Sequence, residues 1–242
     1  MLQVSGLEHR RGGVAVLAGI SLEVARGRIA CVVGERGSGK TALLDTLMGV
    51  RPATAGSVRF RGVDVTALRP QERARLGMAY VPHGHRCFPQ LSVLGNLLVA
   101  AEAAKQPREA LDEALDVIPA LRPLLGRTAG NLPVGGRQQL ALARALVTRP
   151  ALLLLDEPAG GLQPRAASDA ESALAGLRDR GVAMLVAERR PGIAARLADT
   201  SAVLTGGRLT MEPYPLPGGR LSMEPHPVAG GRVATGPYPL AG

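Results

Sequence analysis

Residues 34–41 read Gly-Glu-Arg-Gly-Ser-Gly-Lys-Thr and fit the pattern G-x-x-x-x-G-K-[ST] at every fixed position. In such a loop, glycines let backbone N–H groups approach phosphate oxygens, and the following helix directs its positive N-terminal end at them. Residues 28–33 before the loop predict a buried strand, and residues 41–48 after it predict a helix. A glycine-rich strand-to-helix turn that binds nothing has the same flanks, but the complete motif in this context favours phosphate binding.

The loop also assigns expected roles to single residues. Lys40 can reach the outer phosphates of a nucleotide as a point charge, and the Thr41 hydroxyl can ligate Mg²⁺. The residues expected to contact the nucleotide here are Gly34, Glu35, Arg36, Gly37, Ser38, Gly39, Lys40, Thr41 and Ala42.

Length and cysteine content limit the remaining possibilities. A chain of 242 residues can form one large domain, or one domain with a tail. No apolar run approaches the 18 or so residues of a membrane span, and the N-terminus lacks the apolar segment of a signal peptide, so we expect a cytoplasmic protein. The two cysteines, Cys31 and Cys87, give neither a disulfide framework nor metal-ligand spacing.

The net charge of +9 raises the question of nucleic acid or an anionic membrane as a partner. Only Lys40 and Lys105 are lysines, and the arginines are scattered without a basic run. Aromatic residues are scarce, which argues against base stacking. The charge therefore indicates a solvated arginine-rich surface, and we expect no nucleic-acid partner.

Strand and helix patterns alternate along the chain. Short apolar segments in Leu2–Val24 predict antiparallel strands, and residues 56–62 predict a hairpin. Ala151–Leu155 and Val182–Val186 predict neighbouring buried parallel strands. The other expected elements are a strand at Met78–Val81 and helices at Ala100–Lys105, Glu109–Val117 and Arg137–Thr148. The chain is therefore expected to be an α/β protein with a mainly parallel core sheet.

The last 37 residues differ from the rest. A 12-residue pattern rich in Pro and Gly begins at Gly206 and recurs at Gly218 and Gly230. We expect residues 206–242 to form an extended, flexible tail. A Pro-rich ligand for a partner and a duplicated segment of little consequence both fit this pattern.

A second motif narrows the class of nucleotide-binding protein. A phosphate loop alone leaves kinases, GTPases, motors and transport ATPases open. Residues 152–158 read Leu-Leu-Leu-Leu-Asp-Glu-Pro, an apolar strand that ends in two acids. Asp156 is placed to hold Mg²⁺, and Glu157 to orient and deprotonate a water that attacks the γ-phosphate. The alternative is a buried strand whose acids only cap the next helix.

Between these motifs, residues 135–146 read Gly-Gly-Arg-Gln-Gln-Leu-Ala-Leu-Ala-Arg-Ala-Leu. Here the chain resembles the ATP-binding subunits of ABC transporters, whose signature is Leu-Ser-Gly-Gly followed by such a helix. Residues 80–93 resemble the corresponding segment of branched-chain amino-acid importer ATPases. The resemblance covers residues 1–205. It implies a P-loop ABC ATPase fold with an N-terminal antiparallel β subdomain and an inserted helical subdomain at about residues 84–149.

The resemblance also implies partners. In that family two ATPase subunits, identical or different, hold ATP between the phosphate loop of one and the signature of the other. Here Val134, Gly135 and Gly136 would be that signature. Transmembrane permease subunits and a solute-binding protein would complete the importer, with this chain peripheral on the inner face of the cell membrane.

Several positions depart from the family pattern. Val134 replaces the signature serine, so a hydroxyl donor to the γ-phosphate is lost. His83 stands where Gln or Glu is usual beside Mg²⁺ and the attacking water. Arg11 replaces the aromatic residue that stacks on adenine, and its planar guanidinium can partly substitute. Arg189 takes the place of a His or Gln at the γ-phosphate and could act as an arginine finger. Residues 159–163 lack the usual Ser and acid.

Three hypotheses follow. The first is an ATP-hydrolysing subunit of an importer of branched-chain amino acids or similar solutes. The second is a catalytically impaired, nucleotide-binding regulatory or structural subunit that depends on a competent partner, suggested by Val134 and Arg189. The third, a soluble ABC protein acting on translation or DNA, would need two ATPase domains, whereas this chain carries one set of motifs.

Overall fold

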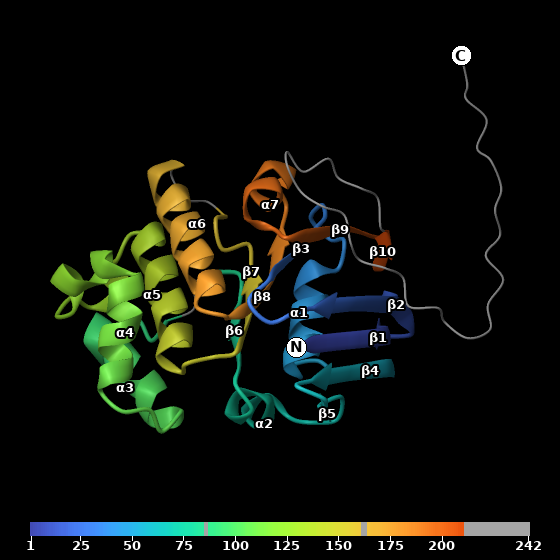
Figure 1. Cartoon of the computed structure of the whole chain (residues 1–242), viewed down its shortest axis with the longest axis horizontal. Coiled ribbons are helices and arrows are strands. Elements are labelled where there is room, and N and C mark those ends of the chain that lie inside the picture. Colours follow the sequence, from blue (N-terminus) through green and yellow to red (C-terminus); the bar gives the residue numbers. More distant parts are fainter. Residues whose placement is uncertain (85–86, 161–163, 211–242) are drawn as a thin grey trace, which may run out of the picture.

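Two β-sheets and the helices packed on them make up the computed structural model, which describes residues 1–84, 87–160 and 164–210 (Figure 1). The larger sheet has the order β10-β9-β3-β8-β7-β6. Its strands are β3 (Ile29–Val33), β6 (Met78–Val81), β7 (Leu152–Asp156), β8 (Ala183–Glu188), β9 (Thr200–Thr205) and β10 (Arg208–Thr210). Every neighbouring pair is parallel except β9 and β10, which confirms the expected mainly parallel core sheet.

The central strands are apolar on both faces because both faces of this sheet are covered. In β3, Cys31 and Val33 pack into one core with the helices, while Ala30 and Val32 pack into a second core with α1 and the N-terminal sheet. Alternate residues of a strand point to opposite faces, so a strand buried on both sides is continuously hydrophobic. The prediction that Ala151–Leu155 and Val182–Val186 form neighbouring parallel strands is confirmed by β7 and β8.

The smaller sheet is antiparallel, as the N-terminal sequence predicts, and has the order β2-β1-β4-β5. Figure 1 shows it at the end of the molecule opposite to α3 and α4. Its strands are β1 (Leu2–Arg11), β2 (Val14–Val24), β4 (Ala55–Phe60) and β5 (Val63–Asp64). The hairpin expected at residues 56–62 corresponds to β4 and β5.

Helices lie between and beside the sheets (Figure 1). Helix α1 directly follows the phosphate loop, and α3, α4 and α5 pack on one another at the helical end of the molecule. The helices are α1 (Lys40–Met48), α2 (Pro70–Arg75), α3 (Val93–Ala103), α4 (Glu109–Val117), the 3-10 helices η1 (Pro119–Leu124) and η2 (Ala129–Asn131), α5 (Val134–Val147), α6 (Pro164–Asp179) and α7 (Pro191–Leu197). In the part of the chain that the structure describes, none of these helices is long and apolar enough to cross a membrane.

Three expected boundaries differ from the structure. The helix expected at Ala100–Lys105 is α3, which spans Val93–Ala103. The helix expected from Arg137 begins at Val134, so Gly135 and Gly136 lie in its first turn. The tail expected from residue 206 begins inside a hairpin, because Arg208–Thr210 form β10 and pair with β9. Gly206 and Gly207, both with positive φ, make the turn of that hairpin. Residues 211–242 lie outside the described part, so the expectation of a flexible tail stays a prediction for them.

Candidate nucleotide site

The candidate site lies where three neighbouring parallel strands end. Gly34 follows β3, Asp156 ends β7, and Glu188 ends β8. These strands are adjacent in the order β3-β8-β7, so their carboxyl ends meet at one edge of the sheet. In open α/β sheets this edge is where ligands bind. The topology therefore brings together motifs that are more than 100 residues apart in the sequence.

The phosphate loop has the geometry of an anion cradle. Gly39 is the N-cap of α1 and has φ 111°, and no side chain caps the helix, so its first N–H groups face the loop. A Cβ on Gly34 would come within 2.5 Å of the Leu204 carbonyl oxygen and of Ser38 Oγ, which only glycine avoids. Ser38 Oγ is itself buried without a hydrogen-bond partner in the described residues. An orphaned buried hydroxyl in this loop fits a ligand with acceptor oxygens.

Lys40 folds back over the loop. Its Nζ donates hydrogen bonds to the carbonyl oxygens of Gly34 at 2.7 Å and Glu35 at 3.0 Å. The side chain is almost fully buried, and its Nζ lies 3.7 Å from Glu157 Oε1. The ammonium group is thus held at the loop that is expected to receive phosphates.

Thr41 and Asp156 meet directly. Thr41 Oγ1 donates a hydrogen bond of 2.7 Å to Asp156 Oδ2. The pKa of the Asp156 carboxyl is raised, because the effect of burial outweighs the opposite effect of the hydrogen bond from Thr41. Hydroxyl and carboxylate oxygens are ligands that Mg²⁺ accepts, so this pair fits the expected metal. No group of three or more His, Cys, Asp or Glu residues suited to a metal occurs among the described residues.

Glu157 is surrounded by three basic side chains. Lys40 Nζ lies 3.7 Å from Oε1, while Arg189 Nε at 3.9 Å and His83 Nδ1 at 4.0 Å face Oε2. The backbone of Glu157 has φ 50°, in the left-handed region that favours glycine. Such strain persists where the surrounding structure enforces it, and its N–H donates to the Ala187 carbonyl at 2.8 Å.

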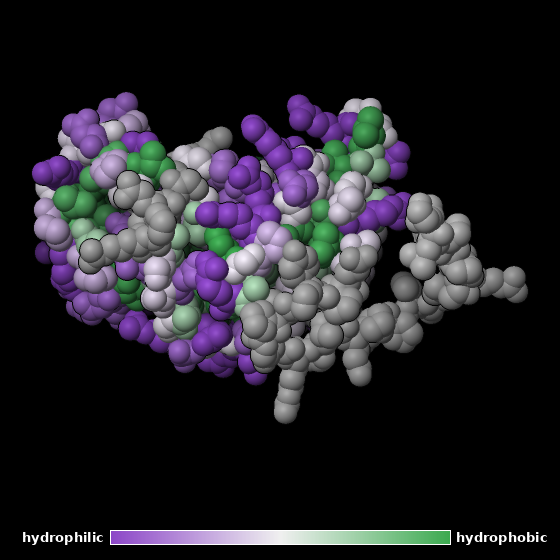
Figure 2. Space-filling model, turned by 90° about the horizontal axis from the view of Figure 1, so that it is seen from above, coloured by the Kyte–Doolittle hydropathy of each residue, from purple (hydrophilic) through white to green (hydrophobic). Residues whose placement is uncertain are grey.

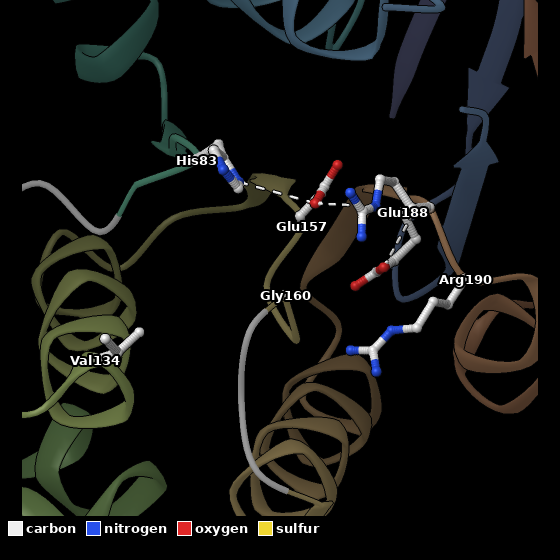
Figure 3. Close-up of a pocket in the computed structure, with 7 residues that line it drawn as sticks. His83, Val134, Glu157, Gly160, Glu188 and Arg190 are labelled. Carbon is white, nitrogen blue, oxygen red and sulfur yellow. Dashed lines mark hydrogen bonds and ion pairs between the residues drawn. The ribbon is translucent and has the colours of Figure 1, made fainter. Parts of the chain in front are cut away.

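A cavity of about 390 Å³ opens beside Glu157 (Figure 3). Figure 3 shows Glu157 between His83 and the loop that carries Glu188 and Arg190, with Val134 on a helix across the cavity. The lining residues are His83, Val134, Glu157, Gly160, Glu188, Arg189 and Arg190. The structure therefore brings His83, Glu157 and Arg189 together, with Lys40 beside them.

Other expected residues lie apart from the phosphate loop. Val134, Gly135 and Gly136 form the uncapped first turn of α5, and Val134 is 45% exposed. Arg11 lies at the tip of the β1–β2 hairpin, paired with Val14. Farther along β2, the Val16 carbonyl would be only 3.2 Å from a Cβ on Gly39, so this hairpin packs against the loop. Residues 161–163 of the altered 159–163 segment lie outside the described residues.

Two residues of this edge carry no role in the sequence analysis. Glu188 is 1% exposed and accepts hydrogen bonds from the N–H groups of Ala159 and Arg189. Arg190 Nη2 donates to the Ala159 carbonyl at 2.8 Å. The one available signal is an acid that ends an otherwise apolar strand, the same pattern that marks Asp156 in β7.

A phosphate loop at the carboxyl edge of a parallel sheet, with an acidic strand end beside it, defines a P-loop nucleotide-hydrolysing protein. The chain belongs to the ABC transporter family, whose model matches residues 17–160. It is an ABC-type ATPase that binds nucleotide, the ATP-binding subunit of a transporter. The family and the α/β architecture expected from the sequence are thereby confirmed.

Relatives extend the similarity over most of the chain. A branched-chain amino acid transport ATP-binding protein, BraG of Pseudomonas aeruginosa, is 34% identical and covers 87% of this chain and 91% of its own. The probable counterpart LivF of Archaeoglobus fulgidus is 35% identical over 80% of this chain and 84% of its own. The solved ADP conformation of the ATP-binding cassette MJ1267 has a TM-score of 0.77 at 26% identity, covering 87% and 89%. The hypothesis of a catalytically impaired subunit gains no support from these relatives.

Proposed function

We propose that this chain hydrolyses ATP to drive an importer of branched-chain amino acids or similar small solutes. The observation that carries the hydrolytic site is the hydrogen bond between Thr41 and Asp156, which joins the two motifs beside Glu157. The names of BraG and LivF support the cargo. An iron-import ATP-binding protein of Streptomyces coelicolor is also 35% identical to this chain, but the match covers only 62% of that protein. The proposed cargo therefore follows BraG and LivF, of which the match covers 91% and 84%.

The phosphate loop, residues Gly34 to Ala42, would wrap the phosphates of ATP with its backbone N–H groups. Lys40 would exchange its bonds to the Gly34 and Glu35 carbonyls for phosphate oxygens. A charge-assisted bond to an anion is stronger than a bond to a neutral carbonyl, which favours the exchange.

Thr41 and Asp156 would hold Mg²⁺ through oxygen atoms. When bound, the ion would supply positive charge that stabilises the negative charge developing on the phosphates. Thr41 Oγ1 can offer a lone pair to the ion, because its present bond to Asp156 uses only its hydroxyl hydrogen.

Glu157 would accept a proton from the water that attacks the γ-phosphate. Lys40 and Arg189 lie on either side of its carboxylate. When ATP binds, both cationic side chains would move from Glu157 to the negatively charged phosphates. Their departure would release Glu157 as a base, while Arg189 would stabilise charge on the γ-phosphate. His83 would contact the water or the metal shell from the third side.

A second ATPase subunit, identical or different, would complete the site. The first turn of α5 presents the N–H groups of Val134, Gly135 and Gly136 without a side-chain cap. Such a turn suits a phosphate on the facing subunit. Arg11, at the exposed tip of its hairpin, would lie against the adenine.

Permease subunits would dock at the helical end, with a solute-binding protein outside the membrane. Phe88 follows the His83 loop and is exposed, yet its ring lies under the Arg144 guanidinium at 4.6 Å. Asn96 fixes its backbone through bonds to both Phe88 N and Phe88 O. Exposed apolar neighbours are Leu91, Leu94, Leu98 and Val99. Figure 2 shows hydrophobic residues among hydrophilic ones at this end of the face drawn. The chain would thus lie on the inner face of the cell membrane.

Mg²⁺-dependent ATP turnover of the purified chain tests the hydrolytic proposal. Lys40→Ala and Glu157→Gln should each abolish turnover, and Glu157→Gln should retain ATP. Glu109→Gln, on the exposed face of α4, is the matched control. Turnover that survives Glu157→Gln would remove its assignment as the base. Uptake of labelled leucine by cells that carry only the Glu157→Gln chain tests the cargo, and normal uptake would exclude it.

A further inference from the structure

One residue next to the candidate base, Ala159, is held at both of its backbone polar groups. Ala159, two residues after Glu157, donates its N–H to Glu188 Oε1 at 3.4 Å. Its carbonyl accepts a bond of 2.8 Å from Arg190 Nη2. Both partners belong to the segment at the end of β8, so this segment brackets the loop that follows Glu157.

Glu188 also connects two other parts of the site. Its Oε2 accepts a hydrogen bond from the Arg189 N–H at 3.1 Å. Its backbone carbonyl accepts one from the N–H of Gly34, the first residue of the phosphate loop, at 3.1 Å. One residue therefore contacts the phosphate loop, the loop after Glu157 and the backbone of Arg189. Figure 3 shows the Glu188 side chain between Glu157 and Arg190.

Burying the carboxyl group of Glu188 costs free energy that a residue needed only for packing would not cost. β8 is buried along its whole length, and Glu188 is its one acid. Burial raises the pKa of the Glu188 carboxyl, while the backbone bonds from Ala159 and Arg189 lower it. An apolar residue would fill the same space without desolvating a carboxyl group. The hydrogen bonds that Glu188 accepts from the N–H groups of Ala159 and Arg189 thus account for an acid at this position.

We infer that Glu188 and Arg190 are positioning residues, which set the distance between the Glu157 carboxylate and the Arg189 guanidinium by bracketing Ala159. The inference rests on the proposed function of Glu157 and Arg189. Neither Glu188 nor Arg190 is proposed to contact the phosphates or the attacking water. Replacing either side chain should therefore lower turnover and leave the affinity for ATP unchanged.

Glu188→Gln and Arg190→Ala test this inference in the full-length chain. Each should lower kcat about 10- to 100-fold, because small misplacements of reacting groups have effects of this size. KM for ATP should stay within about twofold. The double variant should lose little more than the worse single variant, because both residues hold the backbone of the same residue, Ala159. The matched control is Glu113→Gln with Arg149→Ala, an exposed ion pair in the helical part.

Hydrogen exchange provides a readout that does not depend on turnover. Both variants should speed exchange of the amide of Ala159, in the peptide that covers residues 152–160, and leave α1 unchanged. Arg190 is exposed, so its replacement leaves the core intact. Unchanged kcat and unchanged exchange would overturn the inference, as would a loss that appears mainly in KM. If the parent chain shows no turnover, the proposed function fails, and exchange at Ala159 still decides whether the bracket exists.

Discussion

The backbone N–H of Gly207 donates a hydrogen bond of 3.0 Å to the carbonyl oxygen of Ser38 in the phosphate loop. The Gly207 carbonyl in turn accepts a bond of 2.9 Å from the N–H of Ala18 in β2. The β9–β10 turn thus joins the phosphate loop to the N-terminal sheet. This turn is also the start of the first 12-residue repeat, so the repeat region begins in direct contact with the candidate site.

Gly207→Val should destabilise this junction. Gly207 has φ 76°, and a Cβ there would lie 2.2 Å from the Val16 carbonyl oxygen. We expect a loss of about 2–4 kcal/mol in unfolding free energy and weaker ATP binding, from strain combined with overpacking. Gly206→Val is the control, because its φ is also positive but a Cβ there meets nothing within 4 Å. Equal losses in urea unfolding would contradict the role given to the clash.

Arg73→Met should destabilise the phosphate-loop helix. Arg73 is 2% exposed, and its guanidinium donates to the carbonyls of Thr46 and Leu47 at the C-terminal end of α1. It also donates to the carbonyls of Thr66 and Leu68. Its removal takes a charge-assisted hydrogen bond from each of these four carbonyls and withdraws a cation from the helix C-terminus, for a loss of about 3 kcal/mol. Chemical denaturation measures this loss, and Arg75→Met, on the exposed face of α2, should change stability little.

Val134→Ser should increase ATP turnover. The residue is exposed in the first turn of α5, so a serine fits without repacking. A regained hydroxyl bond to a charged phosphate is worth about 1–3 kcal/mol, or roughly a 5- to 150-fold rate increase where it acts in the transition state. Val134→Ala removes the same methyl groups without adding a hydroxyl. An identical gain in both variants would mean that bulk at this position, and not the hydroxyl, limits turnover.

The Cys31 thiol should be inert in the folded chain. Burial, followed by repulsion from Glu188 and Asp199, raises its pKa far above the usual range. The reactive thiolate is therefore absent at pH 8 as long as the strand stays folded. In a Cys87→Ser variant, iodoacetamide should label Cys31 only after denaturation. Fast labelling under native conditions would show that the sheet opens readily around β3.

The parts of the fold that follow local pattern were predictable from the sequence. β7 and β8 are continuous apolar runs, and such runs suit strands covered on both faces. The start of α5 was missed because Gly135 and Gly136 are poor helix formers, and packing overrides that propensity. β10 was missed because its three residues belong to a repeat rich in Pro and Gly, whereas the Gly206–Gly207 turn suits a hairpin.

The candidate site likewise contains residues that sequence motifs reveal and residues that only the folded structure reveals. Motifs located Lys40, Thr41, Asp156 and Glu157, because each motif carries its own chemistry in a short stretch. Their roles remain predictions. Glu188 and Arg190 had no motif, since their contacts with Ala159 arise only when β7 and β8 lie side by side. Arg73 resembles any other arginine in sequence, and only the fold buries it against the end of α1.

The left-handed backbone of Glu157 means that the residue proposed as the base has a conformation that favours glycine over glutamate. A non-glycine residue in this region costs about 1–3 kcal/mol, which glycine would largely avoid. A glycine at position 157 would relieve that strain and give a more stable protein that lacks the proposed base. Selection for thermal resistance alone would therefore favour inactive cassettes, and screens that aim to stabilise this protein need turnover as a second criterion.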